Sequence, residues 1–220
     1  MKLHNCMAFS RSQPTTVRVR SLLARTTLIL VLTASLLVPA YAQTGTDAGI
    51  TFAKKREEQT RKQLRQLLSE YDLDPWIFTR EVKVEAGVIP HSHPILTIDA
   101  DNLDDDNRLL AVFLHEQIHW FEEQNDKAKD RAIEDLKEMY PNPPDHEKVG
   151  TRSEYSTYLH LIVNWLELDA MTELVGRETA RRLAAEEEYY VWVNDQVLSD
   201  TEKIGSVLKK HDLIIDPTAQ

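Results

Sequence analysis

The sequence predicts an α+β fold that is mostly helical, with a small sheet whose edge strand packs on a buried helix and a helical body after it. Three observations support this fold class. Only 6 of the 220 residues are glycine. Long stretches carry apolar residues at helical spacing, and two short segments alternate with a period of two. A chain of this length has room for one domain with a proper core.

The first 42 residues have the features of a signal peptide. A basic stretch precedes the apolar run "TLILVLTASLLV", and Ala40 and Ala42 stand three and one residues before an expected cleavage between Ala42 and Gln43. The alternative is an uncleaved membrane anchor, but the run is shorter than the roughly 20 residues that a bilayer requires. We therefore expect an exported protein, periplasmic or secreted, with a mature domain of residues 43–220 and no stable membrane insertion.

The expected mature domain is strongly acidic. The segment 1–42 carries five lysine or arginine residues and no acid, so its removal changes the formal net charge from −10 to −15. This charge argues against nucleic acid as a partner. Cys6 is the only cysteine and precedes the cleavage site, so packing or a metal must stabilise the domain.

The elements are expected in a simple order along the chain. Residues 50–72 form a solvent-facing helix, and the segments 80–89 and 95–100 form two strands. Pro90 and Pro94 lie between the strands, which implies an edge position or a bulge. A buried helix follows the N-cap candidates of "NLDDDN". Further helices are expected over residues 126–140, 153–175, 177–198 and 200–211.

The stretch "HEQIH" in the buried helix predicts a zinc site. His115 and His119 are four residues apart, so both imidazoles lie on one face of the helix and can bind one ion. Glu116 stands about 100° around the helix, where a base can take a proton from a water molecule at the metal. Imidazole and carboxylate ligands suit zinc. The alternative is a pair of core histidines that bond to carboxylates or backbone.

A third ligand must come from elsewhere in the chain. The apolar segment "HLIVNWLELDA" places His160, Asn164 and Glu167 on one helical stripe. Glu167 is favoured as the ligand and His160 is the alternative; if it is not a ligand, His160 is the preferred catalytic donor to a developing oxyanion. Glu122 is expected to accept an imidazole N–H.

These features resemble the gluzincins, the zinc metallopeptidases of the zincin type whose third ligand is a glutamate. The resemblance rests on "HEQIH" in a buried helix, a strand upstream and "ELDA" in a later helix. It implies one Zn²⁺ per chain, bound by His115, His119 and Glu167, with Glu116 as the general base. It also implies that a substrate peptide adds as a strand beside residues 95–100.

The predicted function is therefore an exported zinc-dependent peptidase that acts on a peptide or protein; the sequence leaves its oligomeric state open. One alternative is a zinc-binding protein without proteolytic activity. A di-iron protein is a second alternative, but that architecture needs another E-x-x-H pair besides Glu116 and His119. His91 and His93 could stabilise a developing oxyanion, bind a second metal ion or cap a bulge. Tyr155 and Tyr158 are weaker candidates for donors to the oxyanion.

Overall fold

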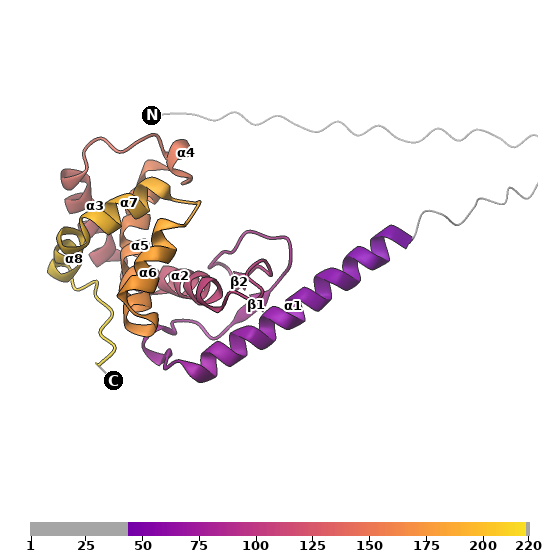
Figure 1. Ribbon diagram of the computed structural model, residues 1–220. Helices are drawn as coiled ribbons and strands as arrows, with labels where there is room; N and C mark the ends of the chain where they lie inside the picture. Colours follow the sequence, from indigo (N-terminus) through magenta and orange to yellow (C-terminus); the bar gives the residue numbers. More distant parts are fainter. Residues whose placement is uncertain (1–43, 219–220) are drawn as a thin grey trace, which may run out of the picture. The chain divides into compact units, whose positions relative to one another are not determined.

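A computed structural model of the chain describes residues 44–218, so the predicted signal peptide and its cleavage site lie outside the described residues (Figure 1). The helices and strands are, in chain order, α1 (Thr44–Glu70), the 3₁₀ helix η1 (Asp74–Trp76), β1 (Val82–Val84), β2 (Leu96–Ile98), α2 (Asp106–Gln124), α3 (Asp126–Met139), α4 (His146–Val149), α5 (Glu154–Val175), α6 (Arg177–Ala185), α7 (Val191–Ser199) and α8 (Thr201–Lys210). The predicted fold class, α+β and mostly helical with a small sheet, is confirmed. In the described part of the chain, no helix combines the length and the apolar character that crossing a membrane requires.

The sheet has two parallel strands, with Val82 opposite Leu96 and Val84 opposite Ile98. All three residues of β2 are buried, because the strand packs against α2. On its other side, Thr97 exchanges both backbone hydrogen bonds with His91, at 2.8 and 3.0 Å. The strand that was expected to offer a free edge to substrate is therefore already paired on both sides at Thr97.

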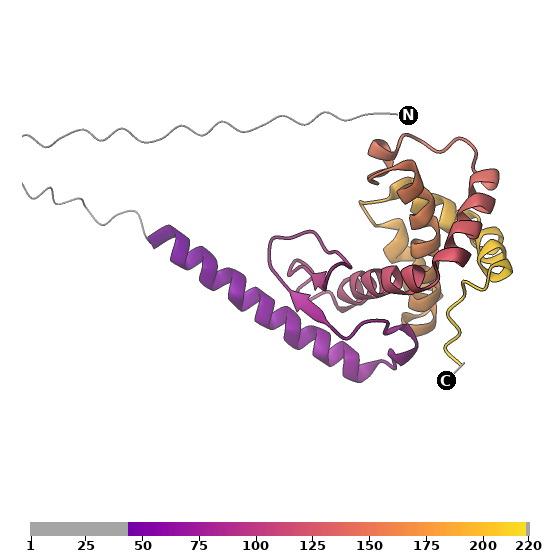
Figure 2. The same ribbon diagram turned by 180° about the vertical axis from the view of Figure 1, so that it is seen from behind.

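Helix α1 lies beside β1 and α2, as Figure 1 and the view from behind in Figure 2 both show. Thr60, Leu64 and Leu67 are its buried residues, and their spacing of four and three places them on one face. Of the polar residues between them, Lys62, Arg65 and Gln66 are exposed, whereas the half-buried Gln63 donates to Asn102 and Asp106. The amphipathic pattern therefore produced the helix that was expected over residues 50–72.

Helix α2 is held in place at its start and along its buried face. Asp105 caps it, because its carboxylate accepts the backbone N–H of Arg108 at 3.0 Å. The fully buried amide of Gln117 accepts the N–H groups of Phe78 and Thr79 and donates to the carbonyl of Thr79, at 2.8 to 2.9 Å. These three bonds fix the middle of the "HEQIH" segment to the chain just before β1.

Helix α5 is the central element of the helical body, because α2, α3, α6, α7 and α8 all pack against it. This position explains why its sequence is apolar on nearly every face. Ser153 caps the start by accepting the N–H of Ser156 at 3.1 Å, and Gly176 ends the helix with a φ of +85°. The boundaries agree closely with the predicted helix over residues 153–175.

The predicted helix over residues 177–198 is wrong in its middle. The chain forms α6 and α7 instead, and residues 186–190, "EEEYY", turn between them. Each helix buries its own apolar residues against α5: α6 buries Ala180 and Leu183, and α7 buries Val193 and Val197. One straight helix cannot present both sets to α5, so packing overrides the local helix preference.

Candidate metal centre

Three histidines meet between α2 and α5. His115 and His119 come from α2 and His160 from α5, and their ring centroids are 5.0, 5.4 and 5.7 Å apart. One nitrogen of each ring lies within 4.8 Å of the others, which is close enough for a metal ion to bind all three. Within residues 44–218, no other group of three or more histidine, cysteine, aspartate or glutamate side chains has ligand atoms this close together.

The Nδ1 nitrogen of each ring already has a partner. The Nδ1 of His115 lies 2.9 Å from Glu167 Oε2, and the Nδ1 of His119 lies 3.4 Å from Glu122 Oε1. The Nδ1 of His160 lies 2.6 Å from the carbonyl oxygen of Ser156. An acceptor at Nδ1 fixes the proton there and leaves Nε2 with a free lone pair. The three rings are therefore prepared to bind a cation through Nε2.

The charges around the centre differ between the rings. Burial, together with the charges of His115 and His119, lowers the pKa of His160 to about 3, so this ring stays neutral. Burial also lowers the pKa of His115, but the hydrogen bond and the charge of Glu167 outweigh it and leave this pKa above its usual value. A neutral imidazole and an imidazole held by a carboxylate are both good metal ligands.

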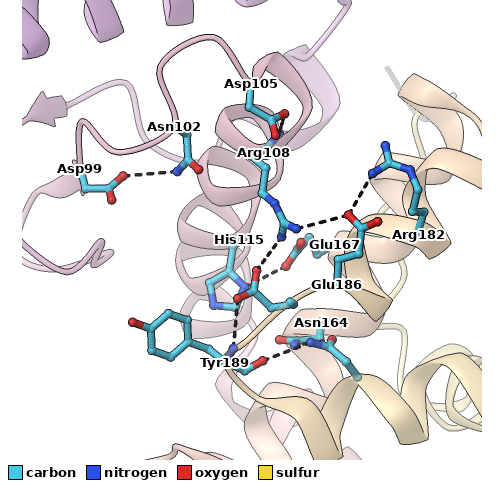
Figure 3. A network of polar contacts seen from close by, with 12 residues as sticks. Asp99, Asn102, Asp105, Arg108, His115, Asn164, Glu167, Arg182, Glu186 and Tyr189 are labelled. Atoms are coloured by element: carbon cyan, nitrogen blue, oxygen red, sulfur yellow. Dashed lines mark hydrogen bonds and ion pairs between the residues drawn. The ribbon is translucent and has the colours of Figure 1, made fainter.

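Glu167, the favoured third ligand, does not belong to the group of three. Figure 3 shows its carboxylate directed at the ring of His115, which it reaches across the interface of α5 and α2. His160, the alternative, occupies the third position. His160 and Glu167 lie seven residues apart on the same stripe of α5, so the tilt of α5 against α2 decides which of them approaches the centre.

Glu116, the expected base, is buried beside the histidines with 7% of its surface exposed. The charge of its carboxylate helps to raise the pKa of both His115 and Tyr190. Among the described residues, no lysine or arginine forms an ion pair with it.

Behind His119, Glu122 lies as expected and is itself supported. Its Oε2 is 2.8 Å from Lys129 Nζ, and Lys129 also donates to Asp126 at 2.6 Å. Burial lowers the pKa of Lys129, but these two carboxylates outweigh it and raise the pKa above its usual value. Lys129 therefore stays charged and holds the Glu122 carboxylate close to the His119 ring.

Tyr190 is part of the site, although its sequence context gave no indication of it. Its ring stacks on His160 with centroids 4.2 Å apart and lies almost parallel to His115 at 6.0 Å. Its backbone is left-handed, with φ +56° and ψ +32°, which is a costly conformation for a residue with a Cβ. Burial and the charge of Glu116 raise the pKa of its hydroxyl.

Other candidate residues are engaged elsewhere. His93 bonds to Glu123 at 2.6 Å and stacks on Trp120, and the Nδ1 of His91 lies 2.9 Å from the carbonyl of Ile89. The hydroxyl groups of the two tyrosines that were considered as oxyanion donors also have partners: Tyr155 donates to Asp130 and Tyr158 donates to the carbonyl of Tyr140. Asn164 donates to Asn194, within the network drawn in Figure 3.

Comparison of the chain with known protein families, with characterised proteins and with solved structures finds no match.

Proposed function

We propose that the chain is an exported, zinc-dependent peptidase in which His115, His119 and His160 bind one Zn²⁺ and Glu116 is the general base. The observation that carries the proposal is that each of the three rings has an acceptor at Nδ1 while one nitrogen of each ring lies within 4.8 Å of the others. Hydrogen-bonded imidazoles of this kind are typical of metal ligands. Core histidines that only satisfied one another would not all leave the same nitrogen free.

The donor set favours zinc over other cations. Three neutral imidazoles fit a tetrahedral ion of borderline softness, and a fourth position stays open in catalytic sites of this type. The trio contains no carboxylate, which argues against the di-iron alternative, because that site needs bridging carboxylates. Compared with the gluzincin resemblance, the proposal replaces Glu167 by His160 as the third ligand and makes Glu167 the acceptor that orients His115.

The residues of the chain then have distinct tasks. A bound Zn²⁺ would lower the pKa of a coordinated water toward about 7 and polarise a carbonyl oxygen. Glu116 takes the proton of the attacking water and returns it to the leaving amine. Glu167 and Glu122 keep the imidazoles of His115 and His119 in their orientation. Tyr190 covers the ring of His160 and limits access of bulk water.

Metal content tests the ligand assignment. Elemental analysis of the purified wild-type protein should give about one zinc per chain, and His119→Ala and His160→Ala should each lose most of it. Glu167→Ala should still bind close to one zinc when zinc is in excess, because Glu167 acts through His115. His91→Ala is the matched control and should equal the wild type. Loss of stoichiometric zinc in Glu167→Ala, with zinc retained in His160→Ala, would restore Glu167 as the ligand.

Peptide cleavage separates the two candidate functions. Glu116→Gln should keep its zinc and lose roughly 10²- to 10⁴-fold in the rate of cleavage of a peptide library. A zinc-binding protein without proteolytic activity is the second candidate, and the stacking of Tyr190 on His160 favours it because an aromatic ring lies against the centre. In that case neither the zinc-loaded wild type nor Glu116→Gln cleaves any peptide of the library.

The export proposal has its own test. N-terminal sequencing of the protein recovered from cells should begin at Gln43. Recovery with Met1 intact would contradict export by cleavage while leaving the metal centre untouched.

A further inference from the structure

The segment between α6 and α7, Glu186–Tyr190, crosses from one helix to the next beside the histidines. Its last residue, Tyr190, stacks on His160. Its first two residues, Glu186 and Glu187, form ion pairs with Arg108 of α2, and Figure 3 shows Glu186 beside Arg108. The segment therefore touches both helices that supply the histidines. We call these five residues the strap.

Arg108 is the contact between the strap and α2. Its guanidinium lies 3.2 Å from Glu187 and 3.5 Å from Glu186. Arg108 precedes His115 by seven residues, so both side chains lie on the same stripe of α2, two turns apart. The same helix thus supplies two histidines of the centre and the charge that attracts the strap.

The other hydrogen bonds of the strap run within it or to α6 and α7, and Tyr190 also packs against the hydrophobic core. Glu187 accepts the N–H of Tyr189 at 3.1 Å within the strap itself, and Asn194 of α7 donates to the carbonyl of Tyr189 at 3.4 Å. Glu186 also accepts a hydrogen bond from Arg182 at 2.9 Å. Arg182 lies in the last turn of α6, so this bond does not connect the strap to α2. In the described part of the chain, Arg108 is the residue of α2 that forms ion pairs with the strap.

The strap is also strained at Tyr190, the residue whose ring stacks on His160. Tyr190 keeps a left-handed backbone although it is not a glycine, so the surrounding contacts must impose that conformation. Release of the contacts with Arg108 would let the backbone relax and carry the Tyr190 ring away from His160. Stored strain of this kind is typical of segments with two states.

We propose that the strap closes over the metal centre and that Arg108 is the positioning residue that keeps it closed, so that substrate and metal enter only when the ion pairs open. The proposal rests on the zinc site proposed above and adds its regulation. Arg108 touches neither the histidines nor the expected reacting atoms; it acts through Glu186 and Glu187.

Two measurements on the purified, zinc-loaded protein test the strap. One is hydrogen exchange of the peptide that spans residues 186–191, and the other is the rate of zinc loss to an excess of chelator. In Arg108→Gln both rates should rise about fivefold, because the ion pairs are partly exposed. High salt should raise the wild-type rates in the same direction. Arg182→Gln is the matched control and should stay within about twofold of the wild type.

Exchange of the charges at Arg108 and Glu187 tests whether the ion pair itself, and not a general loss of stability, controls the two rates. Arg108→Glu should open the strap further than Arg108→Gln, since it repels Glu186 and Glu187. Adding Glu187→Arg to Arg108→Glu should return both rates to within about twofold of the wild type. Unchanged exchange of residues 186–191 in folded Arg108→Gln, or no recovery in the double variant, would overturn the proposal.

The outcome for the strap is distinguishable from the outcome for the function. If the wild type binds no zinc, the metal proposal fails, while faster exchange in Arg108→Gln still supports the strap. If zinc binds but neither rate responds to Arg108→Gln, the strap fails and the metal centre stands.

Discussion

Each imidazole of the proposed centre depends on a different acceptor. His115 has the carboxylate of Glu167 at 2.9 Å, His119 has that of Glu122 at the longer distance of 3.4 Å, and His160 has the Ser156 carbonyl of its own helix. The acceptor of His160 cannot be removed by changing a side chain. The two carboxylates can, and this makes their contributions measurable.

Glu167→Gln should weaken zinc binding about tenfold without abolishing it. The amide oxygen can still accept the Nδ1–H of His115, but it lacks the negative charge that strengthens the ligand, and loss of such partners typically costs roughly 10- to 100-fold in affinity. Competition titration with a zinc-sensitive dye measures the change. A zinc affinity equal to that of the wild type would mean that the charge of Glu167, whose Oε2 lies 2.9 Å from His115 Nδ1, does not strengthen zinc binding.

Asp99→Asn should stabilise the protein at neutral pH. Burial, and next the charge of Asp101, raise the pKa of the Asp99 carboxyl, so the folded state binds this proton more strongly than the unfolded state does. The wild type therefore gains stability as the pH falls from neutral toward the carboxyl's ordinary value of 3.8, and the asparagine variant lacks this gain. Urea unfolding at pH 7 and pH 5 measures both effects. A variant that is less stable than the wild type at pH 7 would contradict the sign.

At this scale, local spacing predicts part of the site. The positions of His115, Glu116 and His119 follow from helical geometry alone. The choice between His160 and Glu167 depends on how α5 is tilted, which no short-range pattern encodes. Tyr190 reaches the site because the chain turns before it, and neither a glycine nor a proline in residues 186–190 announces that turn.

Among the elements, α5 shows how closely a helix in the centre of a body is packed. Trp165 on α5 donates its indole N–H to the carbonyl of Thr201, at the start of α8, at 2.7 Å. Gly205, one turn further along α8, lies against the same ring: a Cβ added there would stand 2.5 Å from Cζ2 of Trp165. The absence of a side chain at residue 205 lets the two helices approach.

Gly205→Ala should therefore destabilise the protein by about 1–3 kcal/mol. The change would normally gain up to about 1 kcal/mol inside a helix, so the sign distinguishes tight packing from helix propensity. Thermal and urea unfolding measure the effect. Ser206→Ala, at the exposed neighbouring position, is the control and should be nearly neutral. A more stable Gly205→Ala would mean that the Trp165 ring moves aside freely.

The helix boundaries show which signals are reliable. Ser153 and Gly176 delimit α5 because a side-chain cap and a positive φ are local properties of those residues. The break between α6 and α7 has no such local cause, since it arises from packing of both helices on α5. The short helices η1 and α4 are likewise absent from the periodic pattern, because one turn of helix is too short to show a period.

For the whole molecule, the metal centre joins two helices that belong to different parts of the chain. A bound ion would tie α2, which carries the sheet and α1 on one side, to α5 in the middle of the helical body. No disulfide can do this, because Cys6 is the only cysteine. A metal ion bound by the three histidines would therefore also link these two parts of the chain.

Zinc at about 100 times its dissociation constant should add about 2.7 kcal/mol to the free energy of unfolding. For a domain of this size the melting temperature should rise by roughly 5–10 °C. Calorimetry of the apo and zinc-loaded protein measures the shift, and His160→Ala should show little of it. An equal shift in His160→Ala would mean that zinc binds and stabilises the protein somewhere else.

The pairing of Thr97 with His91 bears on which peptides such an enzyme can accept. Peptidases that extend their sheet with the substrate read the main chain, so they tolerate many sequences. Here the backbone groups of Thr97 are already occupied by the protein's own loop. If the chain is the peptidase proposed above, recognition of the peptide would fall to its side chains or chain ends, and we expect such a peptidase to accept few targets.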